Sequence, residues 1–369
     1  MKKLFGAIIV ILVLIIAIGI ISQTADTISQ TVENETTRAV TTDTIDRVWN
    51  LRMMGLNPYD FDDSIVMRWA ADEIRERTNG RVVIEHFPGG MLGGFWGRIE
   101  EVLQGAVEMG AISVPFSFDY RFGIVCIPWM IKDHEDAKTL WRPGTNLFDV
   151  LHDILYDNGL KMFGLLPGGL SGIGTIEPFN HNNVWDFTRP SGEILIRVPP
   201  YETLRIMADV IQLMADVMQL RTEVVAFADL HPALSTGVVD GWIGGGAELN
   251  YRFVGDVINY FYDFRLYDET LTIVMSLDIY YSLPAEYRAI ISEVMLEATV
   301  HALDKRASRD AEFKQRLRDH GITVFVPTDA ERAQMAYQFR TLGWPKFADM
   351  FGLEIMNLLL DDVGLPPIQ

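Results

Sequence analysis

The sequence predicts an α/β protein with two lobes and a long helix that spans both of them. The chain has 369 residues, of which 49% are hydrophobic and 22% charged, so it can bury a large core. Two stretches alternate strand-like and helix-like patterns, one before Val114 and one after Gly159. A helical pattern of unusual length then runs from Pro284 to Gly321.

The first α/β unit opens with a strand-like stretch at 48–54, followed by a helix. Asp62 or Asp63 is expected to cap the start of this helix, and Gly80 to end it. The unit continues with a strand at 81–87, a glycine-rich turn, a helix at 98–104 and a strand that ends at Val114. Ligands of parallel sheets bind at the carboxyl ends of the strands, so the loops expected to meet a ligand are 55–60, 89–94 and 115–121.

The second unit repeats this alternation and leads into the long helix. Its expected elements are strands at 161–166, 193–198 and 223–227, a helix at 201–220 and a short helix that ends in Gly237–Gly241. Pro284 suits the first turn of the long helix and Gly321 suits its carboxyl end. At about 1.5 Å per residue this helix would exceed roughly 50 Å, which is more than one lobe needs.

The amino terminus is a targeting segment. Lys2 and Lys3 precede an uncharged apolar run from Leu4 to Ile21, which approaches the length that spans a bilayer. Because no Ala-x-Ala cleavage motif follows, we favour an uncleaved membrane anchor over a signal peptide for residues 1–25. The polar residues 26–45 are expected to form a flexible stalk, which places the remaining chain outside the cytoplasmic membrane.

Charge and residue usage exclude several function classes. The formal net charge of −19 argues against nucleic-acid binding, which needs a basic surface. Cys126, the single cysteine, stands among isoleucines and valine and is interpreted as a core residue. The seven histidines lack metal-ligand spacing, and no Ser-His-Asp signature is visible. We therefore expect no metal, cofactor or catalytic residue.

A tandem heptad interrupts the second unit. Met207–Leu213 is repeated as Met214–Leu220, with a difference only between Ile211 and Met218. The favoured interpretation is a duplication that lengthens a helix by two turns and keeps its apolar face.

Five segments, in order, carry a family resemblance. They read Glu76–Val82 with Phe87–Gly93, Val102–Met109, Ile196–Pro199, Ala233–Gly241 and Ser282–Arg288. Over about residues 48–355, the chain resembles the DctP-type solute-binding proteins of tripartite ATP-independent periplasmic (TRAP) transporters.

The resemblance implies a periplasmic-binding-protein-like clamshell with a long helix across both lobes. It implies that the protein is not an enzyme, that its ligand is a small organic acid, and that it delivers this ligand to the membrane subunits of the transporter. We place lobe I at residues 46–173 and 271–310, and lobe II at 174–270 and 311–369. The expected location is extracytoplasmic, in the periplasm or on the outer face of the cytoplasmic membrane.

Arg197 is the leading candidate for the ligand site. It lies in the apolar run Ile194–Val198, which is typical of a buried strand, where a guanidinium is costly unless it is paired. From the residues alone, a structural salt bridge and a ligand contact both stay open. The resemblance favours the ligand contact, because family members place their carboxylate-binding arginine in this Arg-Val-Pro context. A planar guanidinium donates two parallel hydrogen bonds to a carboxylate.

Two positions depart from the pattern of sialic-acid-binding relatives. Ser171 stands where those relatives have a second arginine, and Gly244 stands where they have an asparagine. Sialic acid is therefore disfavoured. Instead, Gly244 and Gly245 are expected to let backbone amides approach and donate to the ligand. For Trp242, an apolar wall of the site and core packing are equally favoured.

The remaining candidates are weaker. Glu269 is a possible polar ligand contact, and Asn57, Tyr120 and Phe116 lie on loops of the first unit. Two other functions stay open: a two-lobed sensory module of a membrane receptor, and a secreted hydrolase with paired carboxylates.

Overall fold

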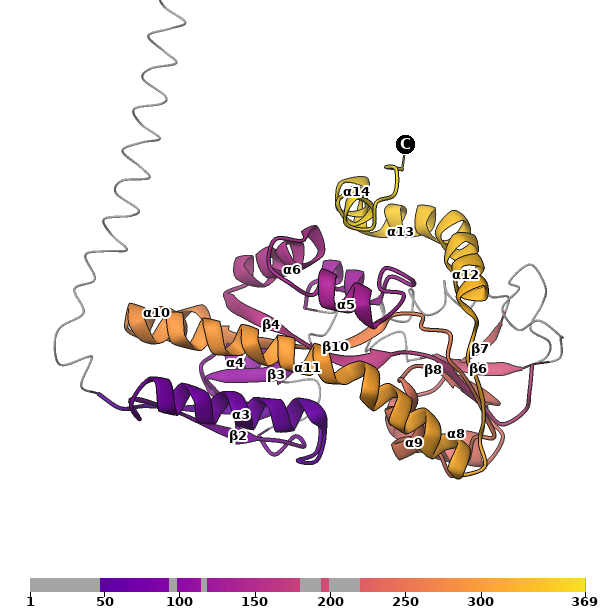
Figure 1. Cartoon of the computed structure of the whole chain (residues 1–369), viewed down its shortest axis with the longest axis horizontal. Helices are drawn as coiled ribbons and strands as arrows, with labels where there is room; N and C mark the ends of the chain where they lie inside the picture. The colour runs from indigo at the N-terminus through magenta and orange to yellow at the C-terminus, as the bar shows by residue number, and fades with distance from the viewer. Residues whose placement is uncertain (1–46, 93–97, 114–117, 180–193, 199–219, 369) are drawn as a thin grey trace, which may run out of the picture. The chain divides into compact units, whose positions relative to one another are not determined.

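The structure, a computed structural model, contains two β-sheets with helices packed around them (Figure 1). It describes the chain except residues 1–46, 93–97, 114–117, 180–193, 199–219 and 369. Residues Val48–Gln369 form one compact unit. Within this unit the predicted α/β class is confirmed, and the strands form two sheets.

The first sheet has the strand order β2-β1-β3-β10-β4. Its strands are β1 (Trp49–Gly55), β2 (Val82–Phe87), β3 (Met109–Ile112), β4 (Leu160–Leu170) and β10 (Asp268–Ser276). As predicted, β1 runs parallel to β2 and β3. However, β10 is antiparallel to both β3 and β4, so the sheet is mixed and not purely parallel. Strand β10 returns from the second unit and therefore enters the sheet from its opposite end.

The second sheet has the strand order β11-β9-β5-β8-β6-β7. Its strands are β5 (Ile173–Thr175), β6 (Leu195–Val198), β7 (Arg221–Val224), β8 (Gly241–Ile243), β9 (Tyr260–Tyr262) and β11 (Thr323–Phe325). Parallel pairing joins β6 to β7 and β8, whereas β5 is antiparallel to β8 and β9.

Two strand segments cross side by side from one sheet to the other. Strand β4 continues into β5 through Ser171, and β9 leads into β10 through Leu266 and Tyr267. The Ser171 amide donates to the Tyr267 carbonyl at 2.8 Å, and the Leu266 amide donates to the Ser171 carbonyl at 3.0 Å. Backbone hydrogen bonding thus continues through these crossing strands. Gly169, with φ of +119°, leaves room for Arg306, whose guanidinium a Cβ at this position would overlap.

Helices of the first unit cover the first sheet. They are α3 (Asp62–Arg77), α4 (Arg98–Leu103), the 3₁₀ helix η1 (Tyr120–Cys126), α5 (His134–Leu140) and α6 (Asn146–Asp157). The capping prediction for α3 was wrong: Phe61 occupies the cap, with no side-chain cap hydrogen bond. Asp62 and Asp63 lie in the first turn and bind Arg309 and Asn57 instead. Gly80 follows the helix with φ of +76°, as its role at the helix end requires.

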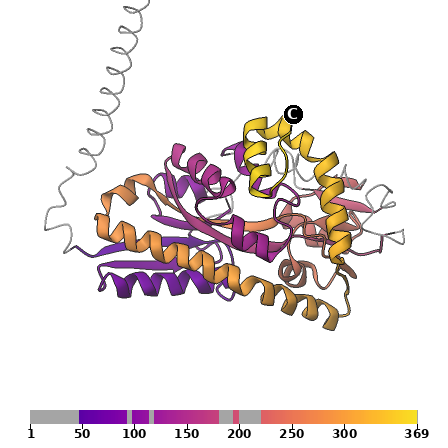
Figure 2. The same cartoon turned by 45° about the horizontal axis from the view of Figure 1, so that its top comes forward.

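Helix α11 (Ala285–Asp319) is the predicted long helix, with 35 residues. Its first half buries Ile291 and Met295 in the core that includes α3 and β1. Its second half buries Phe313 and Leu317 in the core of the second sheet, beside Trp242. One helix therefore packs on both sheets (Figure 2). Pro284 stands immediately before the helix and not in its first turn.

The remaining helices of the described chain follow the second unit and the long helix. They are η2 (Phe227–Asp229), α8 (Leu230–Ser235), α9 (Ala247–Val254), α10 (Leu277–Ser282), α12 (Asp329–Leu342), α13 (Trp344–Phe351) and α14 (Leu353–Asp362). The last three were not predicted. Asp362 of α14 accepts hydrogen bonds from the amides of Asn146 and Leu147 at 2.9 and 2.7 Å, and so stabilises the start of α6.

Three other sequence predictions concern buried or terminal segments. Cys126 is buried, and burial raises the pKa of its thiol, so its interpretation as a core residue is confirmed. The apolar run Leu4–Ile21 and nearly all of the tandem heptad lie outside the described residues. Within the described part of the chain, we find no helix with both the length and the apolar character needed to cross a membrane.

Candidate ligand-binding site

Arg197 lies on β6 of the second sheet, between β8 and β7, and is 5% exposed. Its Nε donates to the carbonyl of Val225 at 2.8 Å. Among the described residues, no carboxylate forms an ion pair with this guanidinium. Burial lowers the pKa of Arg197 to about 10. A buried cation with one neutral acceptor is costly, so the structure favours an anion from outside the fold as its partner.

Two aromatic side chains lie next to Arg197. Trp242 of β8 is its register partner in the parallel pair, and Phe227 places its ring centroid 5.9 Å from the guanidinium carbon. The two aromatic rings are 6.3 Å apart. Phe227 is 52% exposed, whereas Trp242 is 3% exposed and donates its indole N–H to Asn250. Trp242 is therefore a core residue, and Phe227 carries the accessible aromatic surface beside the arginine.

The turn after β8 brings Gly244 and Gly245 against Glu269. These glycines have φ of +143° and +64°, and a Cβ on either would press on the indole of Trp242. The Gly245 amide donates to Glu269 Oε1 at 2.7 Å, and the Gly244 amide donates to the Gly172 carbonyl at 3.2 Å. Both amides thus already have acceptors within the protein. In this structure the turn orients a carboxyl group and packs an indole.

Ser171 and Tyr267 connect these groups. Ser171 is fully buried in the crossing strands, and its hydroxyl accepts from the Tyr267 amide at 3.3 Å. Burial raises the pKa of the Tyr267 phenol, Glu269 raises it further, and Arg197 opposes the rise. The phenol therefore lies within the electrostatic range of both the guanidinium and the carboxyl group. Arg197, Ser171 and Glu269 surround the same buried tyrosine, where the second sheet meets the crossing strands.

The candidates of the first unit lie elsewhere. The Asn57 side chain donates to Asp63 at 3.2 Å, and its carbonyl accepts from the Gly89 amide at 2.8 Å, next to the carboxyl end of β1. Tyr120 is 47% exposed at the start of η1. Neither has a described contact with Arg197, and Phe116 lies outside the described residues. Their part in a ligand site stays a prediction.

A second region deserves comparison because it forms an open groove of about 450 Å³. The groove is lined by His231, Tyr251, Arg252, Phe253, Asp256 and His320. His231 and Asp256 already bind each other at 2.9 Å, so their charge is satisfied internally. Among the described residues, no group of three acidic, histidine or cysteine side chains is placed to hold a metal ion. Arg197 therefore remains the stronger centre for ligand binding.

Sequence reasoning missed Val225, Phe227 and Tyr267. The role of Val225 lies in a backbone carbonyl, which no side-chain pattern reveals. Phe227 and Tyr267 reach Arg197 only after the strands are paired, and an aromatic side chain is ordinarily expected to have a core role.

Comparisons with known proteins agree with this architecture. The chain matches the model of the bacterial extracellular solute-binding proteins, family 7 (DctP), over residues 66–181 and 202–347. It is 23% identical over 296 residues, 77% of this chain and 82% of the relative, to the C4-dicarboxylate-binding periplasmic protein DctP of Rhodobacter capsulatus.

Solved structures have the same fold. A TRAP periplasmic solute-binding protein from Ochrobactrum anthropi has a TM-score of 0.75 at 19% identity, covering 86% of this chain and 95% of that one. Another, from Desulfovibrio salexigens with bound orotic acid, has a TM-score of 0.71 at 19% identity, covering 86% and 99%. The family match extends over more than half of the sequence, and the chain therefore belongs to the bacterial extracellular solute-binding proteins of family 7.

Proposed function

We propose that this protein is the extracytoplasmic solute-binding subunit of a TRAP transporter, which captures a small organic acid and delivers it unchanged to the membrane subunits. The observation that carries the proposal is the guanidinium of Arg197, which is buried in the second sheet with one backbone acceptor and no described carboxylate partner. A ligand carboxylate supplies the missing charge and two further acceptors.

The neighbours of Arg197 narrow the chemistry of the ligand. Phe227 offers an apolar face, which suits a short carbon skeleton or a planar ring. The relatives support the same class, since one is named for C4-dicarboxylates and another contains orotic acid. Family membership supports the delivery step, because these relatives serve TRAP transporters.

We place the hinge of the two lobes in the crossing strands, near residues 173 and 270. Lobe I is proposed to comprise 46–173 and 271–310, and lobe II 174–270 and 311–369. The end of β4 at Leu170 and the start of β10 at Asp268 support this position. The C-terminal helices of the proposed lobe II contact the proposed lobe I, because the Trp344 indole donates to the Pro128 carbonyl at 3.0 Å.

A thermal-shift screen of small organic acids tests the function. A ligand that binds only the native state raises stability by RT ln(1 + [L]/Kd), which is about 2.7 kcal/mol at a concentration of about 100 Kd. We expect one or more carboxylic acids to raise the melting temperature, and neutral isosteres such as the amide to leave it unchanged. Recovery of the acid unaltered after incubation separates a binding protein from a hydrolase.

Binding is expected to depend on pH through Glu269. Burial raises the pKa of this carboxyl from 4.5 to about 7, while the Gly245 amide and Arg306 oppose the shift and Asp268 adds to it. The native state therefore keeps a proton that the unfolded chain loses near pH 4.5, and the resulting stabilisation is lost as the pH rises to about 7. An anionic ligand also favours the neutral carboxyl, because two negative charges in one buried site repel each other.

The affinity for the acid selected in the screen should thus fall by roughly tenfold between about pH 6 and about pH 8. Calorimetry at constant ionic strength measures this change. Glu269→Gln keeps an oxygen for the Gly245 amide but cannot ionise, so its affinity should be nearly constant over the same range. An equally steep pH dependence in this variant would assign the titration to another group.

We further propose that residues 4–22 remain in the mature protein as a membrane anchor. The supporting observation is the long apolar run with Lys2 and Lys3 before it and no cleavage motif after it. The expected result is a protein in the membrane fraction whose amino-terminal sequence begins at or near Met1. A mature terminus near Ala25 in the native host would show that the segment is a cleaved signal peptide.

A further inference from the structure

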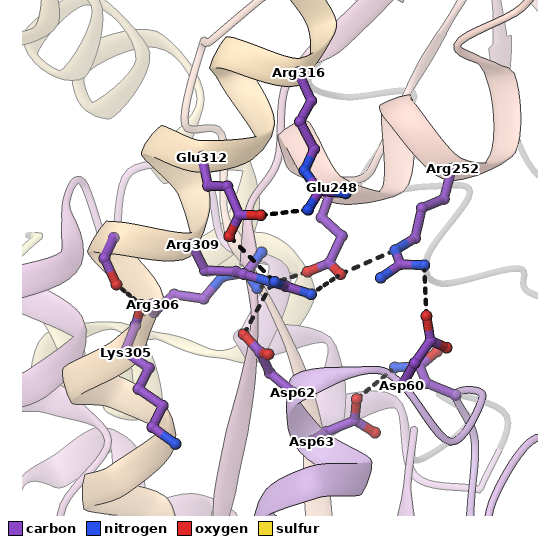
Figure 3. Close-up of polar contacts among 12 residues, drawn as sticks. Asp60, Asp62, Asp63, Glu248, Arg252, Lys305, Arg306, Arg309, Glu312 and Arg316 are labelled. Carbon is purple, nitrogen blue, oxygen red and sulfur yellow. Dashed lines mark hydrogen bonds and ion pairs between the residues drawn. The ribbon is translucent and has the colours of Figure 1, made fainter.

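Three elements from different parts of the chain meet beside the crossing strands (Figure 3). The first is the start of α3 with the loop before it, which packs on β1 and β2 of the first sheet. The second is α9, which follows β8 of the second sheet. The third is α11, which contacts both of the others. All three contribute charged side chains to one network.

Glu248 of α9 lies at the centre of the network. Its side chain is 5% exposed and accepts from three arginines. Arg252 Nε on the same helix is 3.1 Å away, Arg309 Nη2 of α11 is 3.2 Å away, and Arg306 Nη1 is 3.5 Å away. This half of the network ties the long helix to the second sheet.

Two carboxylates from the first sheet complete the network. Asp60, in the loop before α3, places Oδ2 3.0 Å from Arg252 Nη1. Asp62, in the first turn of α3, places Oδ2 3.3 Å from Arg309 Nε. Arg252 and Arg309 therefore each join a carboxylate of the first sheet to Glu248 of the second. We call Asp60, Asp62, Glu248, Arg252 and Arg309 the ionic latch.

The ionic latch can open without leaving a buried charge unpaired. Arg252 keeps Glu248 on its own helix, and Arg309 keeps Glu312 on its own helix at 3.2 Å. Arg309 belongs to the proposed lobe I, so separation of the lobes breaks the pairs Arg252–Asp60 and Arg309–Glu248. Arg252 then keeps Glu248, and Arg309 keeps Asp62. Asp60 is 65% exposed, so water solvates it once it is released. Because every charged group keeps a partner or is solvated by water, the closed and open forms of the ionic latch differ little in free energy.

We propose that Arg252 and Arg309 are positioning residues for ligand capture, which hold the two lobes closed through Asp60 and Glu248 and weaken their hold as the salt concentration rises. This inference rests on the proposed function for its biological meaning, but the lobe movement is measurable without a ligand. The contact of Arg252 with the exposed carboxylate of Asp60 is screened by salt, so closure should respond to ionic strength.

Fluorescence energy transfer between dyes on Asp72→Cys and Val238→Cys measures closure of the ligand-free protein. These positions lie on α3 and before β8, and both are well exposed. In about 20 mM NaCl, Asp60→Asn should lower the ratio of closed to open molecules at least about threefold. In about 500 mM NaCl the parent should fall to within about twofold of this variant.

Arg77→Gln is the matched control. Arg77 also joins α3 to α11, through Glu297 at 2.7 Å, but both partners pack with the first sheet. This variant should keep the closed-to-open ratio of the parent. In a protein that already carries Arg252→Gln, adding Asp60→Asn should not change the closed-to-open ratio further. The proposal is overturned if Asp60→Asn closes like the parent at low salt, or if Arg77→Gln opens the protein equally. Failure of every acid in the thermal-shift screen would instead count against the proposed function alone.

Discussion

Arg197→Lys is expected to weaken binding of the selected acid at least about 100-fold, and Arg197→Ala should weaken it further. Lysine preserves the charge but loses the planar pair of donors, so the comparison separates geometry from net charge. Since the guanidinium has only the Val225 carbonyl as a described acceptor, its removal should leave the melting temperature of the ligand-free protein unchanged or higher. Calorimetry and melting curves measure the two effects.

Arg340 provides a matched control for this experiment. It is another largely buried arginine that donates to a carbonyl, that of Trp129 at 2.7 Å, and burial lowers its pKa as well. It belongs to α12, outside the group around Arg197. Arg340→Lys should leave affinity intact. If Arg197→Lys instead binds within about threefold of the parent and melts several degrees earlier, Arg197 is a structural residue.

Lys314→Met is expected to destabilise the protein by about 3–5 kcal/mol. Lys314 lies on α11 and places its ammonium 2.5 Å from Asp263 and 2.6 Å from Asp310, and all three side chains are buried. Methionine matches its length but leaves two buried carboxylates without their shared cation. Arg265 still contacts Asp263 and His134 still contacts Asp310, which limits the loss.

The pH dependence of this loss has a defined sign. Burial opposes ionisation of Asp310, but His134 and Lys314 together hold its pKa well below the ordinary value of 3.8. The stabilisation is therefore present above pH 3.8 and is lost as the pH falls further. Urea unfolding at neutral and acidic pH measures this difference. Lys346→Met, an exposed change on α13, is the control, and a loss below about 1 kcal/mol in Lys314→Met would contradict the assignment.

The sequence was most informative where structure is local. Pro284 and Gly321 bracket α11 within a few residues, and Gly80 follows the end of α3. The antiparallel insertion of β10 could not be predicted, because it depends on pairing with strands more than a hundred residues away. The cap of α3 was mispredicted for a similar reason, since Asp62 is drawn to Arg309 of a distant helix.

The candidate site was predicted in part. The position of Arg197 inside an apolar run predicted a buried strand, and the burial of Arg197 confirms this prediction. The acceptors of the Gly244 and Gly245 amides were not predictable, because Gly172 and Glu269 meet them only through tertiary structure. Phe227 resembles any other apolar residue until strand pairing places it beside a guanidinium.

The burial of Cys126 makes the protein a natural subject for site-directed spectroscopy. Its thiol is buried in the core, and its raised pKa keeps it protonated at neutral pH. Maleimide and methanethiosulfonate reagents should therefore not react with it in the folded protein. A cysteine introduced on the surface is then labelled alone, in the parent background. Dyes or spin labels can report distances between the lobes while the native thiol stays in place, and its reaction with such a reagent would signal unfolding.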